Sequence, residues 1–372
     1  MKNEKINILM VLSSTGIGGA EIFALNVVRF INHDKYHIDF VVSSFAQGIS
    51  IEAECRSYGC NFFQLPRFKI YNYAKYVESW DEFLRGHHYN IVYAHTTNSA
   101  SIYLKIAKKY GMKTIAHSHS SGYRGNFLEQ MVKKYFASKV GKYADYWFAC
   151  SELAAERLYG NDYMKYHYYY NIPNAINTEK YLFNEDIRRK IRCKHHIDET
   201  TFVCGHVGSF TVPKNHKFLI DIFELVLKKN INSKLLCCGD GPTLQSIKDY
   251  AKIKGLLNYI VFAGVVNNVN EYMMAMDTFI FPSIFEGFPI SILEAESTGL
   301  NIVMSDVISK DVDITELVHR CKLDQTASIW ADKVLEISRH SRKEYNRYIS
   351  DSKYNINYTI KDFEQLFVKL LH

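Results

Sequence analysis

Short apolar runs alternate with amphipathic stretches along the whole chain, and this alternation predicts the fold. Ten runs have the length and near-continuous apolarity of buried strands: 7–13, 37–43, 91–95, 113–118, 146–151, 202–208, 234–241, 260–266, 278–283 and 301–306. Strands separated by helical patterns predict βαβ units and parallel sheets. Because the runs are apolar on both strand faces, we expect helices on both sides of each sheet. The pattern is that of an α/β protein.

The pattern breaks once, at 168–181, where Pro173 and three asparagines interrupt the periodicity. A chain of 372 residues exceeds the roughly 250–300 residues at which a single core stops growing. We therefore predict two doubly wound, Rossmann-like domains, residues 1–172 and 173–357, that face each other across a cleft with ligand sites at the carboxyl ends of their strands. An amphipathic helix over 358–372 is expected to pack back onto the first domain.

The charge is unevenly distributed. Residues 1–170 contain 20 Lys and Arg against 14 Asp and Glu, whereas 171–372 contain 25 of each, so the net charge of +6 comes from the first half. This excess favours phosphates or an anionic membrane surface. It is too small to predict nucleic-acid binding, and no nucleic-acid motif is present.

The apolar run at 6–12 is too short for a signal peptide. No apolar run approaches the ~20 residues that cross a bilayer. The eight cysteines are scattered, which is typical of reduced thiols. We expect a cytoplasmic protein.

Two loops of the first domain follow predicted strands. The loop 14–21 contains Gly18 and Gly19 and opens a helix, so its backbone amides are suited to an anion. Glu21 stands where a dinucleotide fingerprint requires a third glycine, and a simple tight turn is the alternative. His117 and His119 end another strand. No carboxylate or cysteine nucleophile accompanies them, so they do not predict a catalytic triad, and a structural role for either remains open.

The second domain carries the most informative spacing. Glu286 precedes a Gly287–Pro289 turn, and Glu294 lies two turns into the helix expected to begin near Ser291. An anion held at the amides of that helix would have a carboxylate on each flank. Two carboxylates would repel a bare diphosphate, but they accept hydrogen bonds from hydroxyls. A nucleoside-diphosphate sugar has hydroxyls on both sides of its diphosphate. Lys214, at another predicted helix start, is suited to a phosphate.

These motifs in this order resemble the retaining glycosyltransferases of family 4. The resemblance rests on "GGAE", "VGSFTVPKNH", "GDGP" and "FPSIFEGFPISILEAESTGLNIVMSD", with Glu286-x7-Glu294 as its centre, and it extends over nearly the whole chain. It implies the GT-B architecture. "SDVISKDVDITELV" and "ASIWADKVLE" are similar to the subgroup found in bacterial capsule and exopolysaccharide clusters.

The resemblance implies roles for individual residues. Glu286 would contact the donor sugar and Glu294 the ribose. The turn of Gly287, Phe288, Pro289 and Ile290 would approach the diphosphate, with Lys214 pairing with its charge. Gly18 and Gly19 would contact the phosphates from the first domain. One of His117 and His119, with a slight preference for His119, would lie beside the anomeric carbon.

The implied activity is transfer of a hexosyl group from a nucleotide sugar to a saccharide or a polyprenyl-diphosphate-linked acceptor, in the synthesis of surface polysaccharides. The resemblance implies that the anomeric configuration is retained and that no cofactor or metal is needed. A uridine diphosphate sugar is the expected donor, by analogy alone. One departure stands out: Ser209 replaces the arginine that the family usually has before the lysine. A non-catalytic partner subunit and a nucleotide-sugar epimerase are the alternatives. Asp311-Val312-Asp313 matches the metal motif of another glycosyltransferase fold, but we expect it to face solvent.

A membrane contact is a further expectation. The stretch 127–148 interleaves Lys133, Lys134, Lys139 and Lys142 with apolar residues, which are Phe127, Met131, Tyr135, Phe136, Val140 and Tyr143. An amphipathic helix packed on the first sheet explains this pattern equally well. If lysines and aromatic rings point outward, they predict reversible binding to an anionic bilayer.

Overall fold

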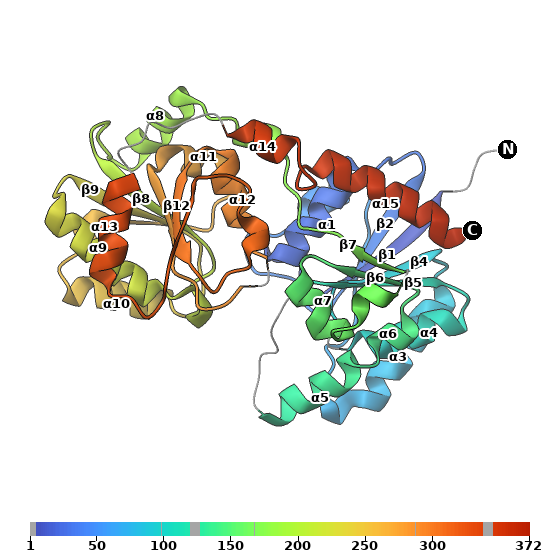
Figure 1. Cartoon of the computed structure of the whole chain (residues 1–372). Coiled ribbons are helices and arrows are strands. Elements are labelled where there is room, and N and C mark those ends of the chain that lie inside the picture. Colours follow the sequence, from blue (N-terminus) through green and yellow to red (C-terminus); the bar gives the residue numbers. More distant parts are fainter. Residues whose placement is uncertain (1–4, 98, 120–126, 167, 287, 338–344) are drawn as a thin grey trace. The chain divides into compact units, whose positions relative to one another are not determined.

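The chain forms two compact units in this computed structural model. One contains residues 1–175 and 356–372, and the other contains 176–355. The structure describes residues 5–97, 99–119, 127–166, 168–286, 288–337 and 345–372, with the backbone alone at 127–129. Each unit has one parallel sheet with helices around it (Figure 1). Both are therefore Rossmann-like, as the alternating pattern predicted.

The first unit has a seven-stranded sheet with strand order β3-β2-β1-β4-β5-β6-β7. Its strands are β1 (Ile6–Leu12), β2 (Tyr36–Val42), β3 (Phe62–Gln64), β4 (Ile91–Ala94), β5 (Lys113–Ser118), β6 (Tyr146–Ala149) and β7 (Tyr169–Asn171). Its helices are α1 (Gly19–Phe30), α2 (Glu52–Ser57), η1 (Ile70–Asn72), α3 (Tyr73–Gly86), α4 (Ala100–Lys109), α5 (Phe127–Ala137), α6 (Val140–Tyr143), α7 (Glu152–Tyr159), η2 (Tyr163–Lys165) and α15 (Ile356–Leu371).

The second unit has a six-stranded sheet with strand order β10-β9-β8-β11-β12-β13. Its strands are β8 (Phe202–Val207), β9 (Ser233–Cys238), β10 (Ile260–Gly264), β11 (Thr278–Phe281), β12 (Asn301–Ser305) and β13 (Val318–Cys321). Its helices are η3 (Thr178–Tyr181), α8 (Glu185–Lys194), η4 (Val212–Lys214), α9 (His216–Lys229), α10 (Leu244–Ile253), η5 (Leu257–Tyr259), α11 (Val269–Ala275), α12 (Ile290–Ser297), η6 (Lys310–Val312), α13 (Ala327–Ile337) and α14 (Asn346–Ser350).

All ten predicted strands are present, and three strands were missed. The missed strands are β3, β7 and β13, and each lies at an edge of its sheet. β3 and β7 have three residues and β13 has four. Only one side of an edge strand is paired, so a short and partly polar segment suffices there. The segment 168–181, predicted as an interdomain crossing, therefore begins with the last strand of the first sheet.

The C-terminal helix α15 belongs to the first unit. It runs beside α1 in Figure 1, and Phe363 packs against Phe23 of α1 with ring centroids 5.6 Å apart. Phe363 and Phe367 are fully buried in the core that covers β1. The apolar face of this amphipathic helix thus completes one side of the first sheet.

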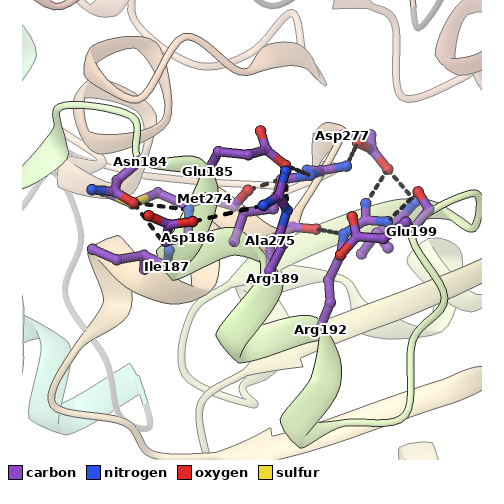
Figure 2. A network of polar contacts seen from close by, with 12 residues as sticks. Asn184, Glu185, Asp186, Ile187, Arg189, Arg192, Glu199, Met274, Ala275 and Asp277 are labelled. Atoms are coloured by element: carbon purple, nitrogen blue, oxygen red, sulfur yellow. Dashed lines mark hydrogen bonds and ion pairs between the residues drawn. The ribbon is translucent and has the colours of Figure 1, made fainter.

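Helix α8 is held to the second unit by buried arginine contacts (Figure 2). The Arg192 guanidinium is inaccessible to solvent, and it donates to Asp277 Oδ2 at 2.7 Å and to the carbonyl oxygens of Ala275 and Thr201. Arg188 donates to the other Asp277 oxygen at 2.6 Å. Cys193 and Lys194 of the same helix are exposed, whereas Arg192 is part of the interior.

Strand order determines where ligands bind in such sheets. In the first unit the chain runs outward from β1 to β3 and then returns to β4 beside β1; in the second it runs from β8 to β10 and returns to β11 beside β8. These two reversals are topological switch points, where the loops after adjacent strands diverge and leave room for a ligand. The predicted site residues of the second unit follow β8 and β11.

Candidate active site

The loops after β8 and β11 are joined to each other by hydrogen bonds. Asn215, which adopts a left-handed conformation with φ of 56°, donates from Nδ2 to the Pro282 carbonyl oxygen at 3.1 Å. The Ile284 amide donates to the Pro213 carbonyl oxygen at 2.8 Å. These bonds place the segment that carries Lys214 against the segment that carries Glu286.

Lys214 and Glu286 form an ion pair. Lys214 Nζ lies 2.7 Å from Glu286 Oε1, and the side chains are only 15% and 17% exposed. Lys214 Nζ also lies 4.6 Å from the ring centroid of Phe281, at the end of β11, a distance that permits cation–π attraction. The structure therefore brings together two of the predicted donor-binding residues. A phosphate that bound Lys214 would compete with or join this carboxylate.

The predicted turn leads into α12. Pro289 caps the helix and Ile290 is its first residue, one position before the expected start. The Phe288 ring is buried and stacks on Tyr354, with centroids 5.4 Å apart, so this side chain anchors the turn and only its backbone is available to a diphosphate. Gly287 lies outside the described residues.

Glu294 lies in the second turn of α12 and is partly buried. The Tyr181 hydroxyl donates to its Oε1 at 2.5 Å. Burial raises the pKa of Glu294 to about 7, and the hydrogen bond from Tyr181 opposes that rise. The carboxyl group is therefore close to its ionisation midpoint at neutral pH.

A third carboxylate, Glu296, was not singled out from the sequence. It is fully buried, and its Oε1 accepts from the Thr315 hydroxyl and amide at 2.7 Å and from the Ile314 amide at 3.1 Å. Burial raises its pKa to about 8. Residues two positions apart on a helix point to different sides. If Glu294 faces the ligand, this spacing indicates that Glu296 faces away from it, and this was the signal in the sequence.

The Gly-Asp-Gly-Pro motif makes a close backbone contact with the loop after β8. Gly239 and Gly241 have φ of 138° and 157°. A Cβ on Gly239 would collide with the Gly208 carbonyl oxygen, and one on Gly241 would lie 2.5 Å from the Phe210 carbonyl oxygen. Glycine is required at both positions. The motif thus supports the loop that contains Ser209.

In the first unit, the glycine loop contains a buried carboxyl group. Gly18 caps α1, and a Cβ there would collide with Glu21 Oε2. Ser13 Oγ, directly after β1, donates to Glu21 Oε1 at 3.2 Å. Burial raises the pKa of Glu21. The residue that broke the dinucleotide fingerprint therefore folds back over Gly18 and supports this loop.

The two predicted histidines differ in their surroundings. His117 is fully buried, with Nδ1 2.8 Å from the Tyr93 hydroxyl and Nε2 3.1 Å from the Ile172 carbonyl oxygen. His119 is partly exposed, and its Nε2 lies 2.8 Å from Nδ1 of His95, which follows β4. Burial lowers the pKa of both, to about 4 for His119. Both rings are therefore neutral near pH 7.

His95 was missed by sequence reasoning, although it ends a predicted strand as His119 does. Ligand atoms of His95, His117 and His119 lie within 4.8 Å of one another. However, both nitrogens of His117 are engaged by protein groups, and the rings of His117 and His119 pack with centroids 3.9 Å apart. Because His117 has no nitrogen left for a ligand, this arrangement does not direct three lone pairs to one ion.

The Asp311-Val312-Asp313 sequence is also engaged internally. Arg320 donates from Nε and Nη2 to the two Asp313 oxygens, at 2.8 Å and 2.7 Å. Asp311 Oδ2 accepts from Ser309 Oγ at 2.9 Å. Asp313 is exposed but paired, so the expectation that this motif faces solvent is only partly met.

The predicted membrane stretch divides into two faces. Val140 is buried, and Phe136 and Tyr143 pack on the core of the first unit. Met131 and Tyr135 are 54% and 56% exposed. The Phe127 side chain lies outside the described residues. The part of the chain that the structure describes contains no helix long and apolar enough to cross a membrane.

Further exposed apolar residues lie next to α5. Tyr73 stacks on Phe136 with centroids 6.1 Å apart, and this brings the start of α3 and η1 to α5. Ile70, Tyr71 and Tyr73 are 49%, 83% and 48% exposed. We use the term aromatic–lysine surface for the set formed by Ile70, Tyr71, Tyr73, Met131, Lys133, Lys134, Tyr135, Lys139 and Lys142.

Two family models match the chain, one in each unit. The model described as "Glycosyltransferase Family 4" matches residues 17–180, and the model described as "Glycosyl transferases group 1" matches residues 201–339. Together they include both glycine motifs, both histidines and the Glu286 to Glu294 segment.

Several bacterial proteins are similar in sequence. EpsF of Bacillus subtilis (strain 168) is 26% identical over 96% of this chain and 94% of its own length. The UDP-Gal:alpha-D-GlcNAc-diphosphoundecaprenol alpha-1,3-galactosyltransferase of Escherichia coli is 25% identical over 60% of this chain and 59% of its own. The capsular polysaccharide biosynthesis glycosyltransferase CapH of Staphylococcus aureus is 27% identical over 46% of this chain and 48% of its own.

A similar solved structure is Anabaena Alr3699/HepE in complex with UDP and glucose, with a TM-score of 0.77 and 15% identity over 98% of this chain and 99% of that chain. At this identity the likeness concerns the fold, which is GT-B. The ordered motifs, the two family models and the fold agree: the chain belongs to the family 4 glycosyltransferases.

Proposed function

We propose that this glycosyltransferase moves a hexosyl group, with retention of anomeric configuration, from a uridine diphosphate sugar to a saccharide carried on a polyprenyl diphosphate. The observation that carries the proposal is the Lys214–Glu286 pair at the switch point of the second unit, followed by Glu294 on α12. The similar Escherichia coli enzyme is named for such a donor and acceptor. The similarity to CapH supports a role in bacterial surface polysaccharide synthesis.

In the proposed reaction, the bond between the anomeric carbon and the phosphate oxygen breaks while the acceptor hydroxyl oxygen bonds to the same face of the sugar. The hydroxyl proton goes to the departing diphosphate. Negative charge develops on the diphosphate, and Lys214 and the first amides of α12 stabilise it. Glu286 accepts hydrogen bonds from hydroxyls of the sugar, and Glu294 accepts hydrogen bonds from hydroxyls of the ribose. His119 contacts the sugar near the anomeric carbon as a neutral ring.

The arginine missing at position 209 bears on this chemistry. With Ser209 there, Lys214 and backbone amides stabilise the diphosphate charge. Lys214 is available only if its ion pair with Glu286 opens or is shared. Binding of the nucleotide sugar therefore replaces Glu286 by phosphate oxygens as the partner of Lys214. Glu286 then accepts hydrogen bonds from hydroxyls of the sugar.

The test combines donor binding with transfer. Nucleotide sugars are screened by thermal shift, since a ligand at 100 times its Kd stabilises the protein by ~2.7 kcal/mol. The best donor is then incubated with polyprenyl-diphosphate-linked N-acetylglucosamine, and products are identified by mass spectrometry. We expect Glu286→Gln to abolish transfer and to leave nucleotide affinity unchanged or raised, because Lys214 is freed. Glu294→Gln should weaken nucleotide binding.

Glu224→Gln is the matched control, because Glu224 also pairs with lysines of the second unit, Lys228 and Lys254, but lies on α9. It should bind and transfer as the parent does. Free sugar released without transfer would support the epimerase alternative. Nucleotide binding without turnover for any acceptor would support a non-catalytic partner subunit. Normal transfer by both glutamate variants would contradict the assigned donor site.

A further inference from the structure

Tyr181 contacts Glu294 from η3, a segment just after the last strand of the first sheet. Its side chain is 9% exposed, and its hydroxyl donates to Glu294 Oε1 at 2.5 Å. A hydroxyl that donates to a carboxylate oxygen forms a charge-assisted hydrogen bond when the carboxyl group is ionised. The Glu286-x7-Glu294 motif contains no indication of this partner, which lies 113 positions away.

The position of Tyr181 is fixed by the surrounding structure. Asn346 Nδ2, on α14, donates to the Thr178 carbonyl oxygen of η3 at 2.7 Å and to Ser297 Oγ of α12 at 2.8 Å. One amide group thus links the helical turn that carries Tyr181 to the helix that carries Glu294. Thr178 is buried beside it. The hydroxyl is therefore presented to the carboxylate by a preorganised scaffold.

Hydrogen bonding to one oxygen leaves the other oxygen of the carboxylate for a ligand. Within the described part of the chain, Oε1 accepts a hydrogen bond from the Tyr181 hydroxyl, and Oε2 has no protein donor. A ribose has two adjacent hydroxyls, each of which donates a hydrogen bond. A carboxylate held at one oxygen and ionised is a better acceptor for that diol than a freely rotating or protonated one.

We propose that Tyr181 is a positioning residue of the nucleotide site: it fixes Glu294 through Oε1 so that Oε2 accepts hydrogen bonds from the ribose hydroxyls of the nucleotide sugar. This inference rests on the proposed function in one respect, the assignment of Glu294 to the nucleotide. It adds a residue outside the glutamate motif and predicts how nucleotide affinity depends on pH.

The pH dependence has a definite sign. Burial raises the pKa of Glu294 to about 7, and the Tyr181 hydroxyl lowers it. The charged residues on the helices packed against α12 are Glu179 and Lys180 of η3 and Arg347 of α14; all three are exposed and none is a cause of the shift. Nucleotide affinity should therefore rise as pH increases through about 7. Removing the hydroxyl should move that rise to higher pH.

The experiment measures UDP-glucose binding by calorimetry between pH 5.5 and 8.5 for the full chain, for Tyr181→Phe, for Glu294→Gln and for the double variant. UDP-glucose is used because its diphosphate has no second ionisation in this range. We expect Tyr181→Phe to bind about 3- to 10-fold more weakly at pH 7, with the difference shrinking at high pH. In the Glu294→Gln background the same change should have no effect.

Tyr345→Phe is the matched control, because Tyr345 donates to Glu316 at 2.6 Å in the same unit and should leave binding unchanged. A second readout needs no ligand: in protein labelled with ¹³C at glutamate carboxyl carbons, the Glu294 resonance, identified by its loss in Glu294→Gln, should titrate at higher pH in Tyr181→Phe.

The outcomes separate the two proposals. If Tyr181→Phe leaves both the carboxyl titration and the pH profile unchanged, the positioning role is wrong. An equal loss of affinity in both backgrounds would also overturn it, because Tyr181 would then act without Glu294. If the carboxyl titration shifts but Glu294→Gln binds UDP-glucose as the parent does, Tyr181 controls Glu294 and the nucleotide assignment fails.

Discussion

At the residue scale, the two histidines at the end of β5 differ in which ring nitrogens are available to a ligand. His117 is surrounded by protein and has both ring nitrogens engaged, whereas His119 is partly exposed and shares one nitrogen with His95. A side chain that contacts substrate in the transition state needs a polar atom that protein groups do not already occupy, and Nδ1 of His119 has no hydrogen-bond partner among the described residues. This contrast favours His119 over His117 as the residue beside the sugar.

We predict opposite consequences for their replacement. His119→Ala should lower kcat by about 10²–10⁴-fold with little effect on unfolding. His117→Ala should lower the free energy of unfolding by about 2–4 kcal/mol, since it leaves a cavity and removes the partner of the buried Tyr93 hydroxyl. Steady-state kinetics and urea unfolding, both followed for each variant, distinguish the two effects. Loss of turnover in His117→Ala with parental stability would reverse the assignment.

At the element scale, short helices and loops derive their geometry from contacts with distant segments. α12 has its cap anchored by Phe288 on Tyr354 and its central carboxylate bonded to Tyr181. Both tyrosines lie near the points where the chain leaves one unit for the other, since Ile176 and Asn355 form a parallel bridge. The candidate donor site is thus built partly from the crossing segments.

Helix α8 offers a test of the same principle for stability. Arg192→Ala should lower the free energy of unfolding by about 3–5 kcal/mol, because it leaves several carbonyl oxygens without their donor and removes one of the two arginine partners of Asp277. Arg189 lies on the same helix with its side chain 62% exposed, and it makes only ion pairs of 3.7–4.0 Å (Figure 2).

Arg189→Ala is therefore the matched control and should change stability by less than about 0.5 kcal/mol. The measurement is chemical unfolding monitored by circular dichroism and by the fluorescence of Trp330, the tryptophan of the second unit, in a variant with Trp80 and Trp147 changed to Phe. Equal effects of the two alanine substitutions would show that the buried network contributes nothing beyond a surface ion pair.

At the scale of the whole molecule, the uneven charge has a structural counterpart in the first unit. The aromatic–lysine surface combines the lysines of α5 and α6 with exposed apolar and aromatic side chains of α5, η1 and α3. Aromatic side chains favour the interfacial region of a bilayer, and each lysine near an anionic surface contributes ~1 kcal/mol of attraction. We propose that this surface holds the enzyme reversibly at an anionic membrane, where a polyprenyl-diphosphate acceptor is found.

The prediction is tested by sedimentation with liposomes that contain anionic lipid, at low and high salt. The parent should sediment at low salt and be released at high salt. Changing Lys133, Lys134, Lys139 and Lys142 to glutamine should abolish binding. The same substitution at four exposed lysines of the second unit, Lys190, Lys228, Lys229 and Lys252, should not. Binding that is lost equally in both sets would indicate a general charge effect and no docking surface.

The sequence alone determined the fold class, because strand length and apolarity on both faces are local properties. It also determined the family, because Glu286, Glu294, Lys214 and the glycine motifs are close in sequence within each loop. It missed β3, β7 and β13, since an edge strand needs little apolar surface. The roles of the predicted site residues stay predictions.

Other features depended on long-range contacts and were decided only by the tertiary structure. Glu294 is paired with Tyr181, and His119 is paired with His95. Lys214 is paired with Glu286, which lies on a different loop. Arg192 reads as one charge in a polar helix, yet its carbonyl partners and Asp277 make it part of the interior. Hydrogen bonds and burial depend on which segments meet in space, and one-dimensional spacing carries that information only within a turn of helix or a single loop.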